Sequence, residues 1–156
     1  MTNGHPDLLK GLRAEQARDV LALGKRLVLS SGAELFPLGA PADALYVILR
    51  GRIRLTLPMQ VRGGEEQVLV EERSPGQAVG WSALTPPYRF TLTATAPLET
   101  EVLALSRETL RAHFDAHPDA GLVVAMNLAA VIGERLQLFQ TMWLREMQRT
   151  VELRCA

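Results

Sequence analysis

The sequence has almost no cysteine and no excess of charge of either sign. Its 156 residues include 1 cysteine, Cys155, so a disulfide within the chain is excluded and a reducing compartment is expected. The 17 basic residues are balanced by 17 acidic ones, which argues against the basic surface of a DNA-binding domain. The N-terminus lacks the apolar segment of a signal peptide, and the longest mostly apolar run, 120–132, is too short to span a bilayer. We therefore expect a cytoplasmic protein without a membrane span.

Histidine is also scarce, and none of the 3 histidines lies on a predicted strand. His113 and His117 have the spacing of two zinc ligands on one helix, but Pro118 interrupts such a helix. We interpret both as exposed polar residues at a helix end. Ser82 has neither a histidine nearby in sequence nor a nucleophile elbow, and Gly63-Gly64 lacks the lysine of a phosphate loop. We therefore expect no catalytic site, no metal site and no enzyme.

Short β-strands punctuated by glycine and proline dominate residues 25–105. The predicted strands are 26–29, 34–36, 44–50, 52–57, 67–72, 78–79, 90–96 and 101–105. Gly63-Gly64 predicts a hairpin between two of them. Leu92, Ala94 and Ala96 alternate with threonines, which predicts a strand with one buried face. Eight such strands favour a sandwich or a jelly-roll barrel.

Helical patterns flank the strand region on both sides. Apolar residues recur at three- and four-residue steps through 6–23, which predicts an N-terminal helix. Ser106 is a candidate N-cap for a short helix, and Pro118 begins a helix that runs to about residue 153, roughly 50 Å at about 1.5 Å per residue. The expected organisation is an N-terminal helix in 1–24, a barrel with a short following helix in 25–117, and a long helix in 118–156.

The long helix carries a heptad seam, which is typical of a two-stranded coiled coil. Its members are Ala125, Ala129, Ile132, Leu136, Phe139, Trp143 and, more loosely, Met147. A second stripe, formed by Leu128, Val131, Leu138 and Met142, is expected to lie on the barrel. A helix longer than its barrel cannot bury the distal seam residues against it, so the seam predicts a parallel homodimer. The alternative is a single amphipathic helix that covers its own domain.

The stretch from Gly32 to Leu55 has a specific spacing of glycines, one acid and apolar pairs. It contains a hydrophobic pair, a glycine, an acid before an apolar-Tyr pair, and a glycine that opens the next strand: Leu35-Phe36, Gly39, Asp43, Leu45-Tyr46 and Gly51. This pattern resembles the signature of the cyclic-nucleotide-binding domain family, the sensor domain of the catabolite-activator and fumarate-nitrate-regulator type. The resemblance covers essentially the whole chain. It implies a mainly β fold with flanking helices, in which a double-stranded β-helix jelly-roll barrel precedes a long dimerisation helix.

The ligand site of that family, the phosphate-binding cassette, departs from its usual pattern in this chain. In the family a glutamate accepts hydrogen bonds from the ribose hydroxyl, and an arginine pairs with the cyclic phosphate. Gly80 and Thr91 match the cassette glycine and a small hydroxyl residue, but Trp81 takes the position of the glutamate. Phe90 takes the position of the arginine, and Arg89 lies one residue early. The candidate ligand-binding residues are Gly80, Trp81, Ser82, Ala83, Leu84, Arg89, Phe90 and Thr91.

These two replacements argue against binding of cyclic AMP or cyclic GMP in the usual way. An indole accepts no hydrogen bond, and an offset of one residue turns a side chain to the other face of a strand. Loss of one charged hydrogen bond costs about 1.5–3 kcal/mol, or about ten- to a hundred-fold in affinity. Three interpretations stay open. The loop holds a different ligand, a cyclic nucleotide or another small anion, between Trp81, Phe90 and Arg89; the two rings fill the pocket; or Trp81 anchors a protein partner.

The expected function is a stand-alone sensor or regulatory domain in signal transduction, with no cofactor assigned. In the family, capture of a ligand is coupled to movement of the long helix. The alternative is a ligand-free homodimeric adaptor subunit that docks a protein partner. Regulators of this family commonly continue from the long helix into a helix-turn-helix domain, whereas this sequence ends at Ala156. We therefore expect no direct DNA binding.

Overall fold

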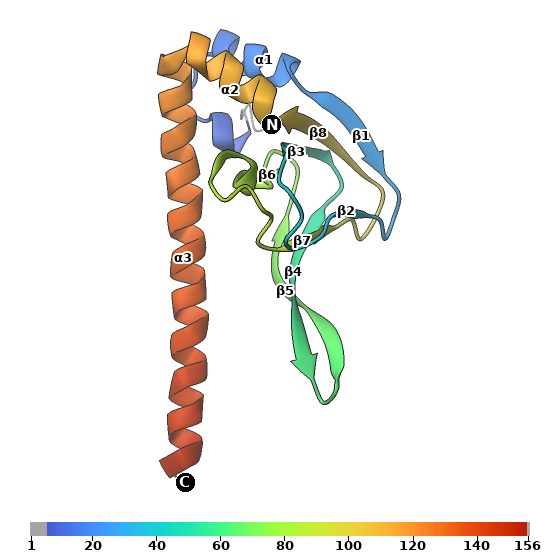
Figure 1. Ribbon diagram of the computed structural model, residues 1–156, viewed down its shortest axis with the longest axis vertical. Helices are drawn as coiled ribbons and strands as arrows, with labels where there is room; N and C mark the ends of the chain where they lie inside the picture. Colours follow the sequence, from blue (N-terminus) through green and yellow to red (C-terminus); the bar gives the residue numbers. More distant parts are fainter. Residues whose placement is uncertain (1–5, 156) are drawn as a thin grey trace.

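Two four-stranded antiparallel sheets form a barrel beside one long helix (Figure 1). The computed structural model describes residues 6–155. The strand orders are β1-β8-β3-β6 and β2-β7-β4-β5, which confirms the predicted jelly-roll barrel with flanking helices. In chain order the elements are η1 (Asp7–Leu9), α1 (Ala14–Ala22), β1 (Lys25–Leu29), β2 (Glu34–Phe36), β3 (Ala44–Arg50), β4 (Ile53–Val61), β5 (Gly64–Arg73), β6 (Ala78–Val79), η2 (Trp81–Leu84), β7 (Thr93–Thr95), β8 (Thr100–Ser106), α2 (Arg107–Ala116) and α3 (Pro118–Cys155).

The barrel core is built from residues that alternate inward along both sheets. Val47 on β3 pairs with Leu103 on β8, and Leu55 on β4 pairs with Ala94 on β7. All four side chains are buried. The alternation predicted around β7 is confirmed, because Leu92, Ala94 and Ala96 are buried whereas the intervening threonines are exposed or partly exposed. Strand β7 itself is shorter than the predicted 90–96, because the chain bends before it.

The N-terminal segment is not the continuous helix predicted for 6–23. It forms the turn η1 and then the helix α1, separated by Gly11, whose φ of +91° lies outside the range that an α-helix requires. The apolar residues at three- and four-residue steps belong to two elements, η1 and α1, and not to one helix. Leu8, Leu9, Ala17 and Val20 all reach the core.

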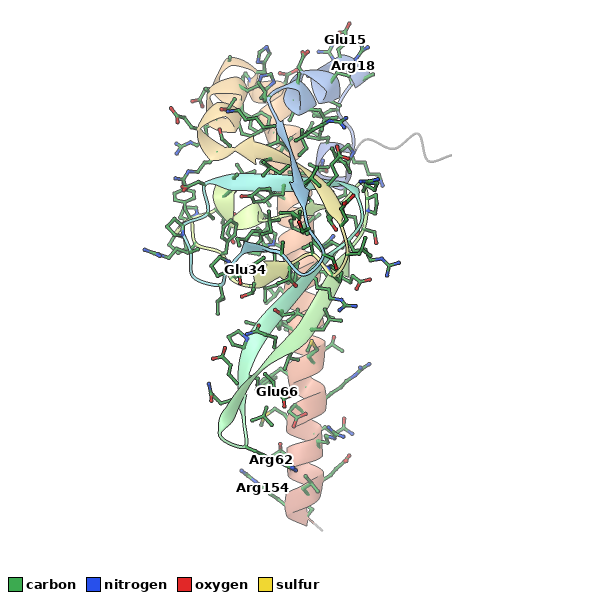
Figure 2. The ribbon with its side chains drawn as sticks, turned by 90° about the vertical axis from the view of Figure 1, so that its right-hand side faces the viewer. Glu15, Arg18, Glu34, Arg62, Glu66 and Arg154 are labelled. Atoms are coloured by element: carbon green, nitrogen blue, oxygen red, sulfur yellow. The ribbon has the colours of Figure 1, made fainter. Side chains whose placement is uncertain are left out.

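Strands β4 and β5 form a hairpin that is longer than predicted and extends beyond the barrel (Figure 1). The predicted segments 52–57 and 67–72 stop where the alternation of apolar and polar residues ends, but the backbone pairing continues to Val61 and Gly64. In Figure 2, Arg62 and Glu66 mark the hairpin end, and Arg154 lies near the end of α3. The hairpin and the long helix therefore project from the barrel in the same direction.

The helices follow the capping signals read from the sequence. The Ser106 hydroxyl accepts a hydrogen bond from the backbone N–H of Thr109 at 3.1 Å, which confirms it as the N-cap of α2. Helix α3 begins at Pro118 and has 38 residues. The Asn127 side-chain amide donates to the carbonyl oxygens of Leu8 and Lys10, both at 2.8 Å, and so ties α3 to the N-terminal turn.

Only the first half of α3 lies against the barrel. Ala120 and Val124 are buried in the core, and Leu128 from the second apolar stripe packs against it. Leu138 and Met142 from the same stripe are exposed, contrary to the expectation that the whole stripe lies on the barrel. The physical reason is length, because the helix has run past the barrel at that point (Figure 1).

Helix α3 is also long and apolar enough to cross a membrane, judged by length and composition alone. Its most apolar window of 18 residues has a mean hydropathy of 1.5, and 6% of that window is buried inside the structure. This apolar window is longer than the run 120–132 considered in the sequence. A single helix of this kind is weak evidence for a membrane span, because the core helix of a soluble protein can meet the same criteria.

Candidate functional site

The candidate site begins at the turn that follows β6. Gly80 has a φ of +81°, and a Cβ placed there would lie 3.1 Å from the Phe90 ring and 3.3 Å from the carbonyl oxygen of Ala44. Glycine is therefore favoured both by backbone conformation and by close packing. The turn leads directly into η2, whose Ser82 and Ala83 are buried against the barrel.

Two phenyl rings fill the barrel side of the site. Phe90 stacks on Phe36 with ring centroids 3.6 Å apart and ring planes 10° apart, and Phe36 lies 5.9 Å from Tyr46. The remaining inner hollow has a volume of about 10 Å³, close to the space of a single water. It is lined by Phe36, Leu55, Gly80, Trp81, Ser82, Phe90, Thr91, Leu92 and Arg135. Phe90, which the sequence analysis aligned with the cassette arginine, is thus a buried apolar ring.

Arg89 lies on the outside of this turn. Its Nη1 donates to the carbonyl oxygen of Gly39 at 2.9 Å, and Arg89 forms an isolated backbone bridge with Pro41. Because neighbouring residues in an extended chain point to opposite sides, burial of the Phe90 ring turns the Arg89 side chain outward. Among the described residues that line the hollows around Trp81, Arg89 does not appear.

An arginine from α3 approaches the site instead. The Arg135 side chain is 10% exposed, its Nη2 donates to Glu71 Oε2 at 2.7 Å, and its guanidinium carbon lies 5.6 Å from the centroid of the Trp81 ring. Burial lowers the pKa of Arg135, while the Glu71 carboxylate opposes that change. Arg135 Nε is buried and has no hydrogen-bond partner within residues 6–155. A buried donor of this kind is uncommon and requires an explanation.

The Glu71 carboxylate forms ion pairs with two arginines. Its Oε1 lies 2.8 Å from Arg73 Nη2, while its Oε2 accepts from Arg135. Arg73 Nη1 in turn lies 3.6 Å from Asp7 Oδ2. Burial raises the pKa of Asp7, against the backbone N–H of Leu8 and the guanidinium of Arg73, which lower it. We name Asp7, Glu71, Arg73 and Arg135 the charge network; it joins η1, β5 and α3.

A larger hollow lies on the outer side of η2, against α3. This outer hollow has a volume of about 250 Å³ and is bordered by Trp81, Thr91, Ile132, Arg135, Leu136 and Phe139. Trp81, Thr91 and Arg135 also line the inner hollow, so the two spaces adjoin. The chemistry available in the outer hollow is an indole face, aliphatic side chains, one hydroxyl and one guanidinium.

The structure brings together only part of the predicted site. Gly80, Trp81, Ser82, Phe90 and Thr91 meet at the inner hollow, whereas Ala83 belongs to the core and Leu84 faces α2 and α3. Two residues were missed, Arg135 and its partner Glu71. The sequence did contain a signal for Arg135. Arg135 stands between Val131 and Leu138 on the stripe expected to lie on the barrel, where a charged side chain needs a partner.

The two histidines lie together at the end of α2. Their rings stack with centroids 4.5 Å apart, and His117 Nδ1 lies 3.0 Å from the carbonyl oxygen of His113. Within the described part of the chain, no group of three or more histidine, cysteine or carboxylate side chains is arranged to hold a metal ion.

Comparison with known proteins identifies the region that this chain shares with others. The family described as "Cyclic nucleotide-binding domain" matches residues 26–117. The chain is 32% identical over 130 residues to the cyclic AMP receptor protein of Thermus thermophilus, covering 83% of the chain and 57% of that protein. It is 29% identical over 133 residues to Glutaminase 1 of Bradyrhizobium diazoefficiens, covering 83% of the chain and 20% of that protein. The Thermus thermophilus catabolite activator protein structure matches with a TM-score of 0.75 and 28% identity, covering 91% of the chain and 63% of that structure.

The chain spans little more than half of the receptor relative and about a fifth of the glutaminase relative. What it shares with both is therefore one region of each protein, and the glutaminase match carries no activity to this chain. The match to the family description covers 26–117, the barrel with its following helix. The chain belongs to the cyclic nucleotide-binding domain family.

Proposed function

We propose that this chain is a sensor or regulatory domain whose cassette does not bind cyclic AMP or cyclic GMP in the family's usual way. The observation that carries the proposal is the replacement of both charged anchors by aromatic rings. Trp81 stands where the family's glutamate would accept from a ribose hydroxyl, and an indole accepts no hydrogen bond. Phe90, buried on Phe36, stands where an arginine would meet the phosphate. Arg89 is engaged with the Gly39 carbonyl instead.

Calorimetric titration with cyclic AMP and cyclic GMP tests this proposal. Each lost anchor weakens affinity about ten- to a hundred-fold, so we expect no binding at micromolar ligand. The double variant Trp81→Glu/Phe90→Arg restores both anchors and should bind more tightly than the parent chain. Arg89→Ala is the matched control and should change nothing. Micromolar binding of cyclic AMP to the unaltered chain, abolished by Arg89→Ala, would contradict the proposal.

We infer that the domain acts as a parallel homodimer through α3. The proposed interface is the seam Ala125, Ala129, Ile132, Leu136, Phe139, Trp143 and Met147, which has the step pattern of a coiled coil. Support comes from exposure, because Leu136, Trp143 and Met147 are large apolar side chains that face solvent in the single chain. In this proposal residues 25–117 sense, residues 118–155 couple the two copies, and the protein acts in signal transduction in the cytoplasm without contacting DNA itself.

A second candidate is a ligand-free adaptor that docks a protein partner. The observation in its favour is the stack of Phe36 and Phe90, which leaves about 10 Å³ inside the barrel. Trp81 fluorescence, recorded in a Trp143→Phe background, separates the two candidates. A saturable response to small anionic metabolites supports the sensor. An emission that is indifferent to them, together with capture of a protein through the barrel surface, supports the adaptor.

A further inference from the structure

We propose that the Met126 side chain of a second copy of this chain fills a hollow between α2 and α3 of the first copy. The inference rests on the homodimer proposed above and goes beyond it, because it assigns a side chain of the partner to a defined place in the fold. In a two-fold dimer the same contact occurs twice. Each copy then binds the other through this hollow as well as through the helix seam.

The hollow between α2 and α3 has a volume of about 260 Å³. We name it the α2–α3 hollow; its walls include Leu84, Tyr88, Arg111, Phe114, Gly121 and Leu128. Among the described residues, it shares none of its walls with the outer hollow. Ala125, the first residue of the seam, also borders it, so the hollow opens beside the proposed interface. Interfaces between subunits are packed about as closely as protein interiors, and a space of this size beside one requires an occupant.

The heptad register of the seam places Met126 opposite this hollow. The step of four residues from Ala125 to Ala129, followed by the step of three to Ile132, makes Ala125 a d position. Gly121 is then a g position and Met126 an e position. In a parallel pair of helices, each g position lies beside the e position of the partner's next heptad. Gly121, in the wall of the hollow, therefore faces the partner's Met126.

The facing positions pair a large side chain with a glycine. A Cβ at Gly121 would lie 3.0 Å from the Cβ of Phe114, so glycine keeps this wall of the hollow open. Met126 is 64% exposed in the single chain, and its flexible thioether suits an irregular apolar space. The next such pair is Leu128 with the partner's Gly133, where a Cβ would meet no atom of the described residues within 4 Å. Large and small residues thus alternate across the two helices, as close packing of facing surfaces requires.

The α2–α3 hollow also adjoins the segment that carries the candidate site. Leu84 is the last residue of η2, which begins at Trp81, and Tyr88 follows in the same loop. The guanidinium carbon of Arg107, the first residue of α2, lies 4.3 Å from the centroid of the Tyr88 ring. The partner's Met126 therefore packs where η2 and α2 meet. A shift of η2 in one copy changes its contact with the helix of the other.

Cross-linking between two different single-cysteine variants tests the contact directly. Both are made in a Cys155→Ser background, which removes the native thiol. One chain carries Met126→Cys, and the other, lengthened by a tag, carries Arg111→Cys on the wall of the hollow. A short bismaleimide should join these two chains. Ala112→Cys, the exposed neighbour on α2 that does not border the hollow, is the matched control and should give no more than background.

Sedimentation equilibrium of two lysine variants measures how much the contact contributes to association. Met126→Lys replaces an apolar side chain by a cation that would lie near Arg111, and should raise the dissociation constant of the homodimer at least about tenfold. Ala130→Lys is the matched control. Ala130 is exposed on the same helix at a b position, away from both the seam and the hollow, so this variant should leave the constant unchanged.

Two results would overturn this inference while the homodimer stands. They are cross-linking to Ala112→Cys as strong as to Arg111→Cys, and a dissociation constant that Met126→Lys leaves unchanged. A chain that is monomeric at micromolar concentration before any substitution would overturn the proposed homodimer, and this inference with it. The unaltered chain therefore distinguishes the two failures.

Discussion

The two halves of α3 carry the same kind of apolar periodicity but meet different surroundings. In the first half, Ala120 and Val124 are 0% and 2% exposed, because the helix lies on the barrel. In the second half, Trp143 is 62% exposed although it is a larger apolar side chain than either. The first half is therefore stabilised within one chain. The second half leaves large apolar side chains exposed in the single chain, and the proposed homodimer would cover them.

The largest effect is expected from placing a charge in the buried half. Val124→Asp puts a carboxylate without a partner into the core and should lower the free energy of unfolding by about 3–5 kcal/mol. Leu122→Asp is the matched control, two residues away and 65% exposed, and should change stability by less than about 0.5 kcal/mol. Urea unfolding of the two variants measures the difference. Equal losses would show that the first half of α3 is not packed as described.

A smaller effect, on association and not on folding, is expected from a charge in the distal half. Trp143→Glu should raise the dissociation constant of the proposed homodimer at least about 100-fold, or about 2.7 kcal/mol, because an aromatic side chain that the proposed seam would bury is replaced by like charges in both copies. Leu144→Glu is similarly exposed but lies off the seam, and should leave association unchanged. Sedimentation equilibrium gives both constants. A stable monomer of the unaltered chain at micromolar concentration would remove the basis of the comparison.

The smallest effect concerns the charge network that helps to hold the first half of α3. Burial raises the pKa of Asp7 in the folded chain above its ordinary value of 3.8, so the folded state holds this proton more tightly than the unfolded state. Asp7 therefore lowers the free energy of unfolding as pH rises from about 3.8 to its folded pKa, and contributes no further slope above it. The difference in unfolding free energy between the parent and Asp7→Asn should fall across that window. A difference that rises with pH would show the opposite shift.

Much of the fold was predictable because its signals are local. The period-two pattern of Leu92, Ala94 and Ala96, the glycine pair in the β4–β5 turn and the Ser106 cap each depend on a few neighbouring residues. The prediction failed at the N-terminus, where apolar steps continue across Gly11. Gly11 has a positive φ that ends the helical pattern, and apolar periodicity alone does not predict which glycine adopts such a conformation.

The candidate site was only partly predictable, because its contacts join distant parts of the chain. Trp81 and Phe90 were proposed as site residues from the sequence, but the Phe36 ring that stacks on Phe90 comes from a distant strand, β2. Arg135 and Glu71 are 64 residues apart, and Arg89 and Gly39 are 50 apart. Such pairs are determined by the closing of the barrel and the path of α3. The spacing of residues along the sequence predicts neither the closing of the barrel nor the path of α3.

The amide of Asn127 gives the long helix a mechanical link to the start of the chain. It donates to two carbonyl oxygens two positions apart in the chain, those of Leu8 and Lys10, so the turn between them has to move with the helix. The amide of Asp7 is tethered in turn to Gly76, just ahead of β6. A slide or tilt of α3 would consequently displace the segment that leads to Gly80, by a route that does not pass through the outer hollow.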